Sequence, residues 1–288
     1  MKLPFATELP HSLRMLGRAV VPRRFRPAIA AQLQHLAHRQ ARKHPQYRAS
    51  LERLNGLRDA HRGETCVILG NGPSLATHDL AEFEGLSTFC LNRGYLKWNE
   101  DGLTPTYAVA VNDLVIEQFH DELAALRCPV FVPWQYHHLF DGRDNIVFIE
   151  ARWQERFFAD VTEGVWPGAT VTFAAMQIAF HMGFKTVILV GVDHRFAQAG
   201  PAHLEVVQDK PDVDHFVKDY FGKGVRWNLP DLEQSEISYR LARKVYEADS
   251  RRIVDATRDG ALTVFEKMPL DEALAEARQA DDRAPGSA

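Results

Sequence analysis

The chain has 288 residues, of which 45% are hydrophobic and 25% charged, a globular composition that excludes general disorder and collagen-like structure. It has only three cysteines and no Cys-x-x-Cys pair, which argues against a disulfide framework and excludes a thiolate zinc cluster. The net charge is −4, and no apolar run reaches the roughly 18 residues that span a bilayer. The first residues, MKLPFATELPHSLRML, lack the apolar stretch of a secretory signal, so we expect a cytoplasmic protein.

Basic residues gather at the N-terminus. Residues 1–62 carry thirteen Lys and Arg but only three acidic residues, whereas the remaining 226 residues carry a net charge of −14. Apolar residues lie among the basic ones, which predicts a helical arm broken near Pro22, Pro27 and Pro45. This arm suits an anionic surface on the inner face of a membrane, as a peripheral contact, or the acidic body of the chain or of a second subunit in a homo-oligomer. The chain has no recognisable DNA- or RNA-binding motif, so we expect no nucleic-acid partner.

Short apolar runs alternate with helical patterns from Glu64 onwards. The runs that predict strands are 65–69, 86–92, 107–112, 129–132, 145–149 and 186–190, and the runs at 252–255 and 262–265 predict short final strands or extended pieces. The segments that predict helices are 114–126, 169–182, 231–249 and 271–280. This alternation predicts an α/β fold, a Rossmann-like, mostly parallel sheet covered by helices on both faces, with a helical N-terminal arm. The predicted divisions are the arm at 1–62, the Rossmann-like domain at 63–268, and a C-terminal helix and frayed tail at 269–288.

The loop after the first predicted strand is the first candidate site, because ligands of parallel sheets bind beyond the carboxyl ends of the strands. It consists of Gly70, Asn71, Gly72, Pro73 and Ser74. Glycines let the backbone approach a ligand, and the amides that open a following helix bind phosphate. No Lys-Ser/Thr pair follows, so this is not a Walker loop, and a leucine stands where a dinucleotide fingerprint has its third glycine. The loop predicts nucleotide-phosphate binding; the alternative is a tight strand-to-helix turn.

Two further strands end in asparagine, at Asn92 and Asn112. An amide side chain both donates and accepts, so asparagines at three successive strand ends, Asn71 included, predict a pocket that reads a base or sugar. Taken singly, each is a turn-former. Thr170 and Thr172 open the helix predicted at 169–182. Each suits an N-cap, and a hydroxyl there also suits an anionic group held at the helix N-terminus.

Candidate catalytic groups follow the most strand-like run, 186–190, and lie in the irregular segment 197–230. Asp193 and His194 come at the end of that strand, where catalytic groups are expected; a turn or N-cap role is the alternative for Asp193. A segment this long with aromatic residues to pack predicts a folded lid. In it, His215 suits a general base because imidazole ordinarily titrates near neutrality; the alternative is an exposed loop histidine. No set of His, Asp or Glu has metal-ligand spacing.

Several of these motifs, in this order, resemble those of a known family. They are Cys66-Val-Ile-Leu-Gly-Asn-Gly-Pro-Ser-Leu75, Thr170-Val-Thr172, Gly183-Phe-Lys-Thr-Val-Ile-Leu-Val-Gly-Val-Asp-His194, Asp214-His-Phe216, Tyr220-Phe-Gly222 and Arg252-Ile-Val-Asp-Ala-Thr257. Over roughly residues 63–267 the chain resembles the 6-hydroxymethylpterin diphosphokinase MptE-like family. That family is similar in fold and phosphate loop to bacterial sialyltransferases that use CMP-sugars, and to the core domain of flagellin motility accessory factors.

The resemblance to sialyltransferases implies a glycosyltransferase that moves a sugar from a nucleotide-sugar, a CMP-sugar first, to a glycan hydroxyl in surface polysaccharide biosynthesis. Asn71, Ser74 and Asn92 would then hold the cytidine nucleotide, with Asn112 nearby and a hydroxyl at 170–172 helping. Tyr220 would stabilise the departing phosphate and His215 would deprotonate the acceptor. No cofactor or metal is required in this mechanism.

Two other functions stay open. In a diphosphokinase, the same loop would cradle ATP phosphates while Asp193 helps to hold Mg²⁺ and the pterin hydroxymethyl group attacks. The chain could instead be a non-catalytic scaffold that binds a nucleotide or a glycan. The loop lacks the lysine common in ATP sites, and the basic arm suits work near a membrane-borne glycan, so the sequence favours glycosyl transfer.

Overall fold

The computed structural model of this protein describes residues 39–197 and 200–281, and the described chain divides into two units between Ala49 and Ser50. Helix α3, Pro45–Leu57, begins at a proline, which has no amide hydrogen to lose in the first helical turn. The apolar residues of the predicted arm between 13 and 36 lie outside the described residues. The second unit begins at Ser50, before the predicted end of the arm at residue 62, and Leu54 belongs to its hydrophobic core.

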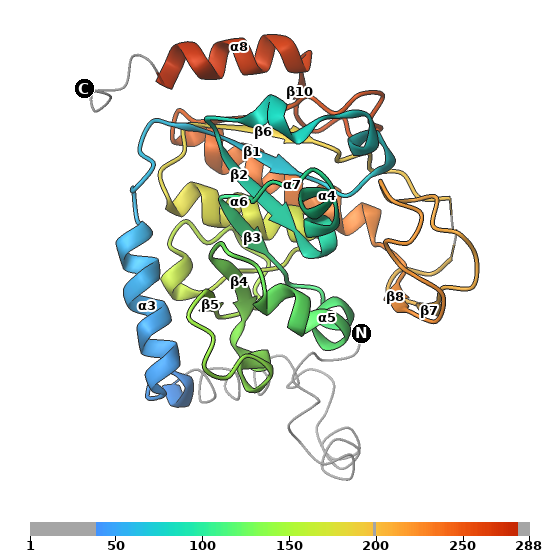
Figure 1. The fold of residues 1–288 in the computed structure, drawn as a ribbon. Helices are drawn as coiled ribbons and strands as arrows, with labels where there is room; N and C mark the ends of the chain where they lie inside the picture. Colours follow the sequence, from blue (N-terminus) through green and yellow to red (C-terminus); the bar gives the residue numbers. More distant parts are fainter. Residues whose placement is uncertain (1–38, 198–199, 282–288) are drawn as a thin grey trace, which may run out of the picture. The chain divides into compact units, whose positions relative to one another are not determined.

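An eight-stranded sheet forms the centre of the second unit (Figure 1). In spatial order its strands are β10 (Glu266–Lys267), β9 (Arg252–Asp255), β6 (Thr186–Val190), β1 (Thr65–Leu69), β2 (Ser87–Leu91), β3 (Tyr107–Val109), β4 (Val130–Pro133) and β5 (Ile146–Ile149). Every neighbouring pair is parallel. All five residues of β1 are buried, as a central strand covered on both faces requires.

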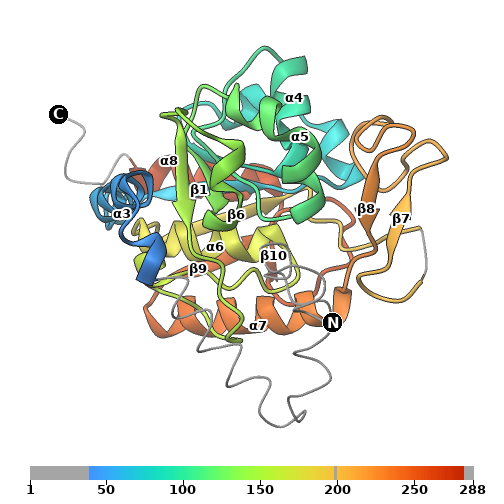
Figure 2. The ribbon, with the colours of Figure 1, turned by 90° about the horizontal axis from the view of Figure 1, so that it is seen from below.

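Helices cover both faces of this sheet (Figure 2). Helices α4 (Tyr95–Glu100) and α5 (Asp113–Ala124) lie on one face, and α6 (Val171–His181) and α7 (Leu232–Ala248) on the other. The last helix of the described residues is α8 (Leu270–Asp281). Residues 172–181 of α6 are all buried, because this helix is enclosed between the sheet and α7. The predicted Rossmann-like α/β fold is therefore confirmed.

Two strand predictions need correction. Residues 262–265 form no strand; the last strand of the sheet is β10, two residues long. The segment predicted as irregular holds an antiparallel hairpin of β7 (Glu205–Val207) and β8 (Arg226–Asn228). Short 3-10 helices that periodicity did not reveal are η3 (Pro73–Thr77), η4 (Leu80–Phe83), η5 (Asn92–Gly94), η6 (Trp134–Leu139) and η7 (Val161–Glu163). The boundary predicted at 268–269 stays a prediction.

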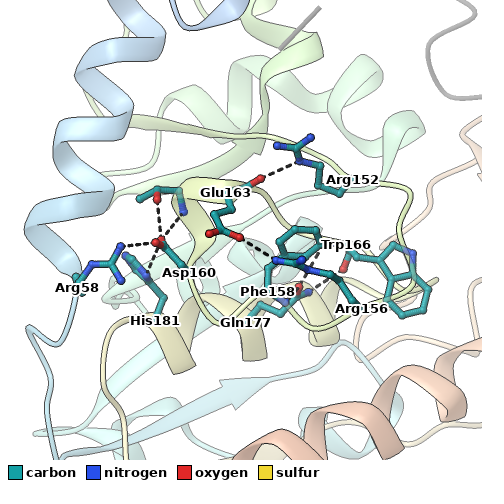
Figure 3. Close-up of polar contacts among 10 residues, drawn as sticks. Arg58, Arg152, Arg156, Phe158, Asp160, Glu163, Trp166, Gln177 and His181 are labelled. Atoms are coloured by element: carbon teal, nitrogen blue, oxygen red, sulfur yellow. Dashed lines mark hydrogen bonds and ion pairs between the residues drawn. The ribbon is translucent and has the colours of Figure 1, made fainter. Parts of the chain in front are cut away.

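A buried amide fastens the connection between β5 and α6 (Figure 3). The Gln177 side chain, on α6, accepts from the amides of Phe158 and Trp166 and donates to the carbonyls of Trp166 and Phe173. Nearby, Asp160 caps η7 and accepts from Arg58 at 2.6 Å. These bonds fix the course of the chain into the start of α6, at the edge of the sheet where the candidate site lies.

No helix within residues 39–197 and 200–281 combines the length and the apolar character that crossing a bilayer requires. The predicted cytoplasmic location and the peripheral membrane contact of the arm stay predictions.

Candidate functional site

The carboxyl ends of β1 and β6 define the candidate site. After β1 the chain proceeds to β2 on one side, while β6 lies on the other side of β1, so the strand order reverses between them. In open α/β sheets ligands bind in the crevice outside such a switch point. The loop after β1 holds Gly70 to Ser74, and the loop after β6 holds Asp193. The sequence therefore placed both candidate groups correctly at this edge.

The glycine loop is held by the end of β6. The amide of Gly70 donates to Val190 O at 2.7 Å, and that of Gly72 donates to Gly191 O at 2.9 Å. A Cβ on Gly70 would lie 2.3 Å from the oxygen of Gly191. The expected reason for these glycines was approach to a ligand. In the structure they make room for the neighbouring loop, and their amides do not form a free phosphate cradle.

Ser74 binds a carboxylate of the chain itself. Its hydroxyl donates to Asp193 Oδ2 at 2.7 Å, and its amide donates to Oδ1 at 3.3 Å. A Cβ on Gly72 would lie 1.9 Å from the same Oδ2, so the carboxylate sits directly against the loop. Asp193 is 6% exposed. A phosphate can take the predicted place at Ser74 only by displacing this carboxylate, or through a cation between the two.

Two of the predicted asparagines carry buried oxygens without a hydrogen-bond partner among the described residues. Asn71 donates from Nδ2 to Leu91 O at 2.9 Å, which joins the ends of β1 and β2, while its Oδ1 is unpaired. Asn92 adopts a left-handed backbone conformation, φ 48°, and its Oδ1 is also unpaired. Buried acceptors of this kind call for a donor such as a ligand hydroxyl or amine.

The other predicted polar groups have structural partners. Asn112 accepts from the amide of Val115 and caps α5. Thr170 accepts from the amide of Thr172 and caps α6, which is the alternative given for it, and its hydroxyl lies 3.3 Å from that of Tyr239 on α7. Thr172 is buried behind it. None of these contacts joins the three residues to the crevice.

His194 faces α7. Its Nε2 lies 3.4 Å from Glu236 Oε1, and its ring lies edge-on to Tyr239 with centroids 6.0 Å apart. The contacts described for it lead neither to the glycine loop nor to the lid. Its predicted catalytic role therefore gains no support from the geometry, whereas Asp193 lies against the glycine loop.

Residues 200–230, here called the lid, form a packed structure as predicted. His215 stacks on Tyr220 with centroids 4.0 Å apart, and Phe221 stacks on Trp227. The amide of Phe216 donates to Asn71 O at 3.1 Å, which ties the lid to the glycine loop. On its outer side the Gln118 side chain of α5 donates to Arg226 O and accepts from Arg226 N, at 2.9 and 3.0 Å.

A carboxylate orients the predicted general base. His215 donates from Nδ1 to Asp212, 2.8 Å from Oδ2, and Asp212 also accepts from the amides of Asp214 and Phe221. Burial raises the pKa of Asp212, but the hydrogen bond and charge of His215 and those amides outweigh it, and the pKa lies below its ordinary value. The carboxylate therefore stays ionised and fixes the tautomer that leaves Nε2 of the imidazole free to accept a proton.

Tyr220 joins the lid to the end of β2. Its hydroxyl accepts from the amide of Arg93 at 3.2 Å, and burial raises the pKa of this phenol well above its ordinary range. It therefore keeps its proton and can donate it in a hydrogen bond. Arg93 is 9% exposed, and its Cζ lies over the ring of Phe119, 3.7 Å from the centroid.

Sequence reasoning missed Asp212 and Arg93. Asp212 stands three residues before His215, a spacing that could have suggested the pair. Arg93 follows Asn92 directly, but nothing in the sequence distinguishes a buried arginine from an exposed one.

The crevice offers Asp193 as a metal ligand for the diphosphokinase mechanism. Mg²⁺ is commonly held by one or two carboxylates together with substrate phosphates. Asp193 fits as one such ligand, although both of its oxygens already accept from Ser74. Over the described ranges, no three His, Cys, Asp or Glu residues gather as a metal-binding group.

Comparisons with known proteins point to one family. The profile described as 6-hydroxymethylpterin diphosphokinase MptE-like matches residues 38–199, more than half of the chain. The match ends before Asp212 and His215. No curated protein matches the chain. A solved structure of a MAf glycosyltransferase from Magnetospirillum magneticum AMB-1 is similar with a TM-score of 0.47 and 14% identity, over 82% of this chain and 41% of that one. The chain thus spans less than half of that protein, and a likeness of this size carries no argument about function.

Proposed function

This chain belongs to the 6-hydroxymethylpterin diphosphokinase MptE-like family, and from that premise we propose that it is a sialyltransferase-like glycosyltransferase. Its donor is a nucleotide-sugar, a CMP-sugar first, and its acceptor is a hydroxyl of a glycan or glycoconjugate in surface polysaccharide biosynthesis. The observation that carries the proposal is the Asp212–His215 pair, held in the lid and joined to the glycine loop through Asn71.

The reaction needs a base for the acceptor and support for the leaving phosphate. His215 takes the proton of the acceptor hydroxyl at Nε2, and Asp212 stabilises the resulting imidazolium. The acceptor oxygen bonds to the anomeric carbon of the sugar. The bond from that carbon to the phosphate oxygen breaks, and its electron pair leaves with the nucleotide. Tyr220, which retains its proton, donates a hydrogen bond to that oxygen.

The donor's nucleoside has matching partners at the strand ends. The unpaired oxygens of Asn71 and Asn92 accept hydrogen bonds from ribose hydroxyls or a base amine. Ser74 reaches the phosphate only when Asp193 gives way. Asn112 and Thr170 support the helices around the site and take no direct part.

Two histidines of the lid provide a matched test. His203 also faces a carboxylate, with Nε2 3.2 Å from Asp231 Oδ2, but its side chain is 65% exposed. In a screen of nucleotide-sugars with the full chain, His215→Asn should lower the turnover number by about 10²- to 10⁴-fold, the usual worth of a general base. Nucleotide affinity should stay the same, and His203→Asn should have no effect. Full activity of His215→Asn would refute the proposed base.

Pyrophosphoryl transfer is the second candidate, favoured by the family's description and by the Asp193 carboxylate beside the loop. Asp193 would hold Mg²⁺, which would supply charge neutralisation at the phosphates. Calorimetry with CMP, CDP, ATP and GTP, with and without EDTA, separates the candidates. Binding of ATP alone, lost in EDTA, would replace the glycosyltransferase proposal with this one. Nucleotide binding without any turnover would favour a scaffold.

A further inference from the structure

Arg93 is a buried cation that forms no ion pair with an acidic side chain among the described residues. The residue is 9% exposed, and its Nη1 has no hydrogen-bond partner among the described residues. Burying a guanidinium is unfavourable unless its donors are bonded. An unsatisfied buried group of this kind marks a place where something outside the chain completes the hydrogen bonding.

The guanidinium is held in a fixed orientation. Its Cζ lies over the ring of Phe119, 3.7 Å from the centroid, and its Nε donates to the hydroxyl of Tyr95 at 3.4 Å. Phe119 has non-helical dihedral angles, φ −134° and ψ 26°, so α5 is kinked at the residue that carries this ring. A stacked guanidinium loses little freedom when it binds, which suits recognition of a planar or tetrahedral oxyanion.

Arg93 lies beside the lid and the glycine loop. The backbone amide of Arg93 donates to Tyr220, the predicted support of the leaving phosphate. Asn71 Oδ1 lies 2.9 Å from the place that a Cβ on Gly94 would take, so the glycine loop lies against the residue that follows Arg93. One donor without a partner and two acceptors without partners, Asn71 and Asn92, thus occupy neighbouring strand ends. A nucleotide presents both an anionic phosphate and hydroxyl or amine donors.

The usual phosphate ligands of such a loop are already occupied. The amides of Gly70 and Gly72 donate to carbonyls of the β6 loop, and Ser74 donates to Asp193. We therefore propose that Arg93, through Nη1, is the residue that binds a phosphate oxygen of the nucleotide. This inference rests on the proposed function for the presence of a nucleotide, but it does not depend on which base the nucleotide carries.

Calorimetry on the full chain tests this inference with CMP, AMP, cytidine and adenosine as probes. Arg93→Gln should weaken the binding of the nucleotide that wild type prefers by about 10- to 100-fold, the worth of a charge-assisted hydrogen bond. Affinity for the matching nucleoside should change by less than about twofold, because the nucleoside carries no phosphate. Arg93→Lys keeps the charge without the fixed fork and should fall between the two.

Arg251 supplies the matched control. Its guanidinium also lies over an aromatic ring, 4.1 Å from the centroid of Phe180, but it donates to the Phe180 carbonyl and pairs with Asp249. Arg251→Gln should lower stability and leave the ratio of nucleotide to nucleoside affinity unchanged. If Arg93→Gln weakens nucleotide and nucleoside equally, Arg93 is a packing residue only and the inference is wrong.

The outcomes separate this inference from the proposed function. If wild type binds AMP more tightly than CMP, and Arg93→Gln loses the advantage of AMP over adenosine, the CMP-sugar proposal fails and the role of Arg93 stands. If Arg93→Gln binds CMP as wild type does, the role of Arg93 fails and the donor proposal stands. If wild type binds neither monophosphate more tightly than its nucleoside, the inference is overturned. Should the glutamine variant not fold, a wild-type crystal with CMP decides, since a phosphate oxygen must lie within hydrogen-bond distance of Nη1.

Discussion

Gly72 leaves space for the carboxylate of Asp193, and a double-mutant cycle can measure the coupling free energy between the two residues. Its backbone, φ −70° and ψ 162°, is one that any residue adopts, so conformation does not require a glycine there. What requires it is Asp193, because a Cβ would lie 1.9 Å from Oδ2, 2.5 Å from Cγ and 2.9 Å from Cβ of that side chain. All three atoms lie too close for a rotation of the carboxylate alone to relieve the contact.

The expected losses of unfolding free energy follow from the two hydrogen bonds between Ser74 and Asp193. Hydrogen bonds to a charged group contribute about 1.5–3 kcal/mol each, so Asp193→Ala, which removes two, should cost about 3–6 kcal/mol of unfolding free energy. Gly72→Ala expels the same carboxylate from Ser74 and should cost about as much. In the Asp193→Ala background, however, the added methyl group enters vacated space, and Gly72→Ala should cost about 1 kcal/mol or less. The expected coupling between the two sites is therefore about 3 kcal/mol.

Urea unfolding of the four proteins, followed by tryptophan fluorescence, gives these free energies. Gly222→Ala is the control, because a Cβ at Gly222 meets no atom within 4 Å. It should change stability by less than about 0.5 kcal/mol. If the Gly72 and Asp193 substitutions are additive, or if Gly72→Ala alone is harmless while nucleotide binding is lost, the glycine serves a ligand and not the carboxylate.

Three further outcomes are expected. Because the folded-state pKa of Asp212 is lowered from 3.8, its stabilisation is complete above that value and is lost as pH falls toward the folded pKa. The difference in unfolding free energy between wild type and Asp212→Asn should therefore shrink below about pH 4 in urea titrations; a constant difference would contradict this. Gln177→Leu strands two amides and a carbonyl in the core and should cost about 3–5 kcal/mol by chemical denaturation, whereas a loss below about 1 kcal/mol would disprove its fastening role. Removing residues 1–38, with six basic residues and one acidic residue, should reduce co-flotation with phosphatidylglycerol vesicles but not with phosphatidylcholine vesicles; equal flotation would exclude the membrane contact.

Strands of the sheet were predictable because each is a short apolar run bounded by polar or small residues. The runs at 65–69, 186–190 and 252–255 match β1, β6 and β9 in full. A buried parallel strand is apolar on both faces, so a short apolar run is the signal that predicts it. The run at 262–265 has the same composition but pairs with no strand, and its Leu262, Val264 and Phe265 are buried against the core instead.

The candidate site was predictable only where chain order determines position. Loops after β1 and β6 meet because parallel topology brings strand ends to one edge, and this placed Ser74 and Asp193 correctly. Their direct bond joins residues 119 positions apart, and no local pattern encodes it. For the same reason, the burial of Arg93 depends on Phe119 from a different helix. Sequence reasoning thus assigned Ser74 to a ligand phosphate, whereas the carboxylate of Asp193 occupies that position in the structure.

The contact between Gln118 and Arg226 has a consequence for self-association. Strand β8 pairs with β7 along one side, which leaves the backbone groups of its other side as a template for a strand from another molecule. The side-chain amide of Gln118 donates to the carbonyl of Arg226 and accepts from its amide, at the residue where β8 begins. One glutamine thereby occupies the two backbone groups of Arg226 with which a strand from another copy of the protein would otherwise pair at this edge of β8.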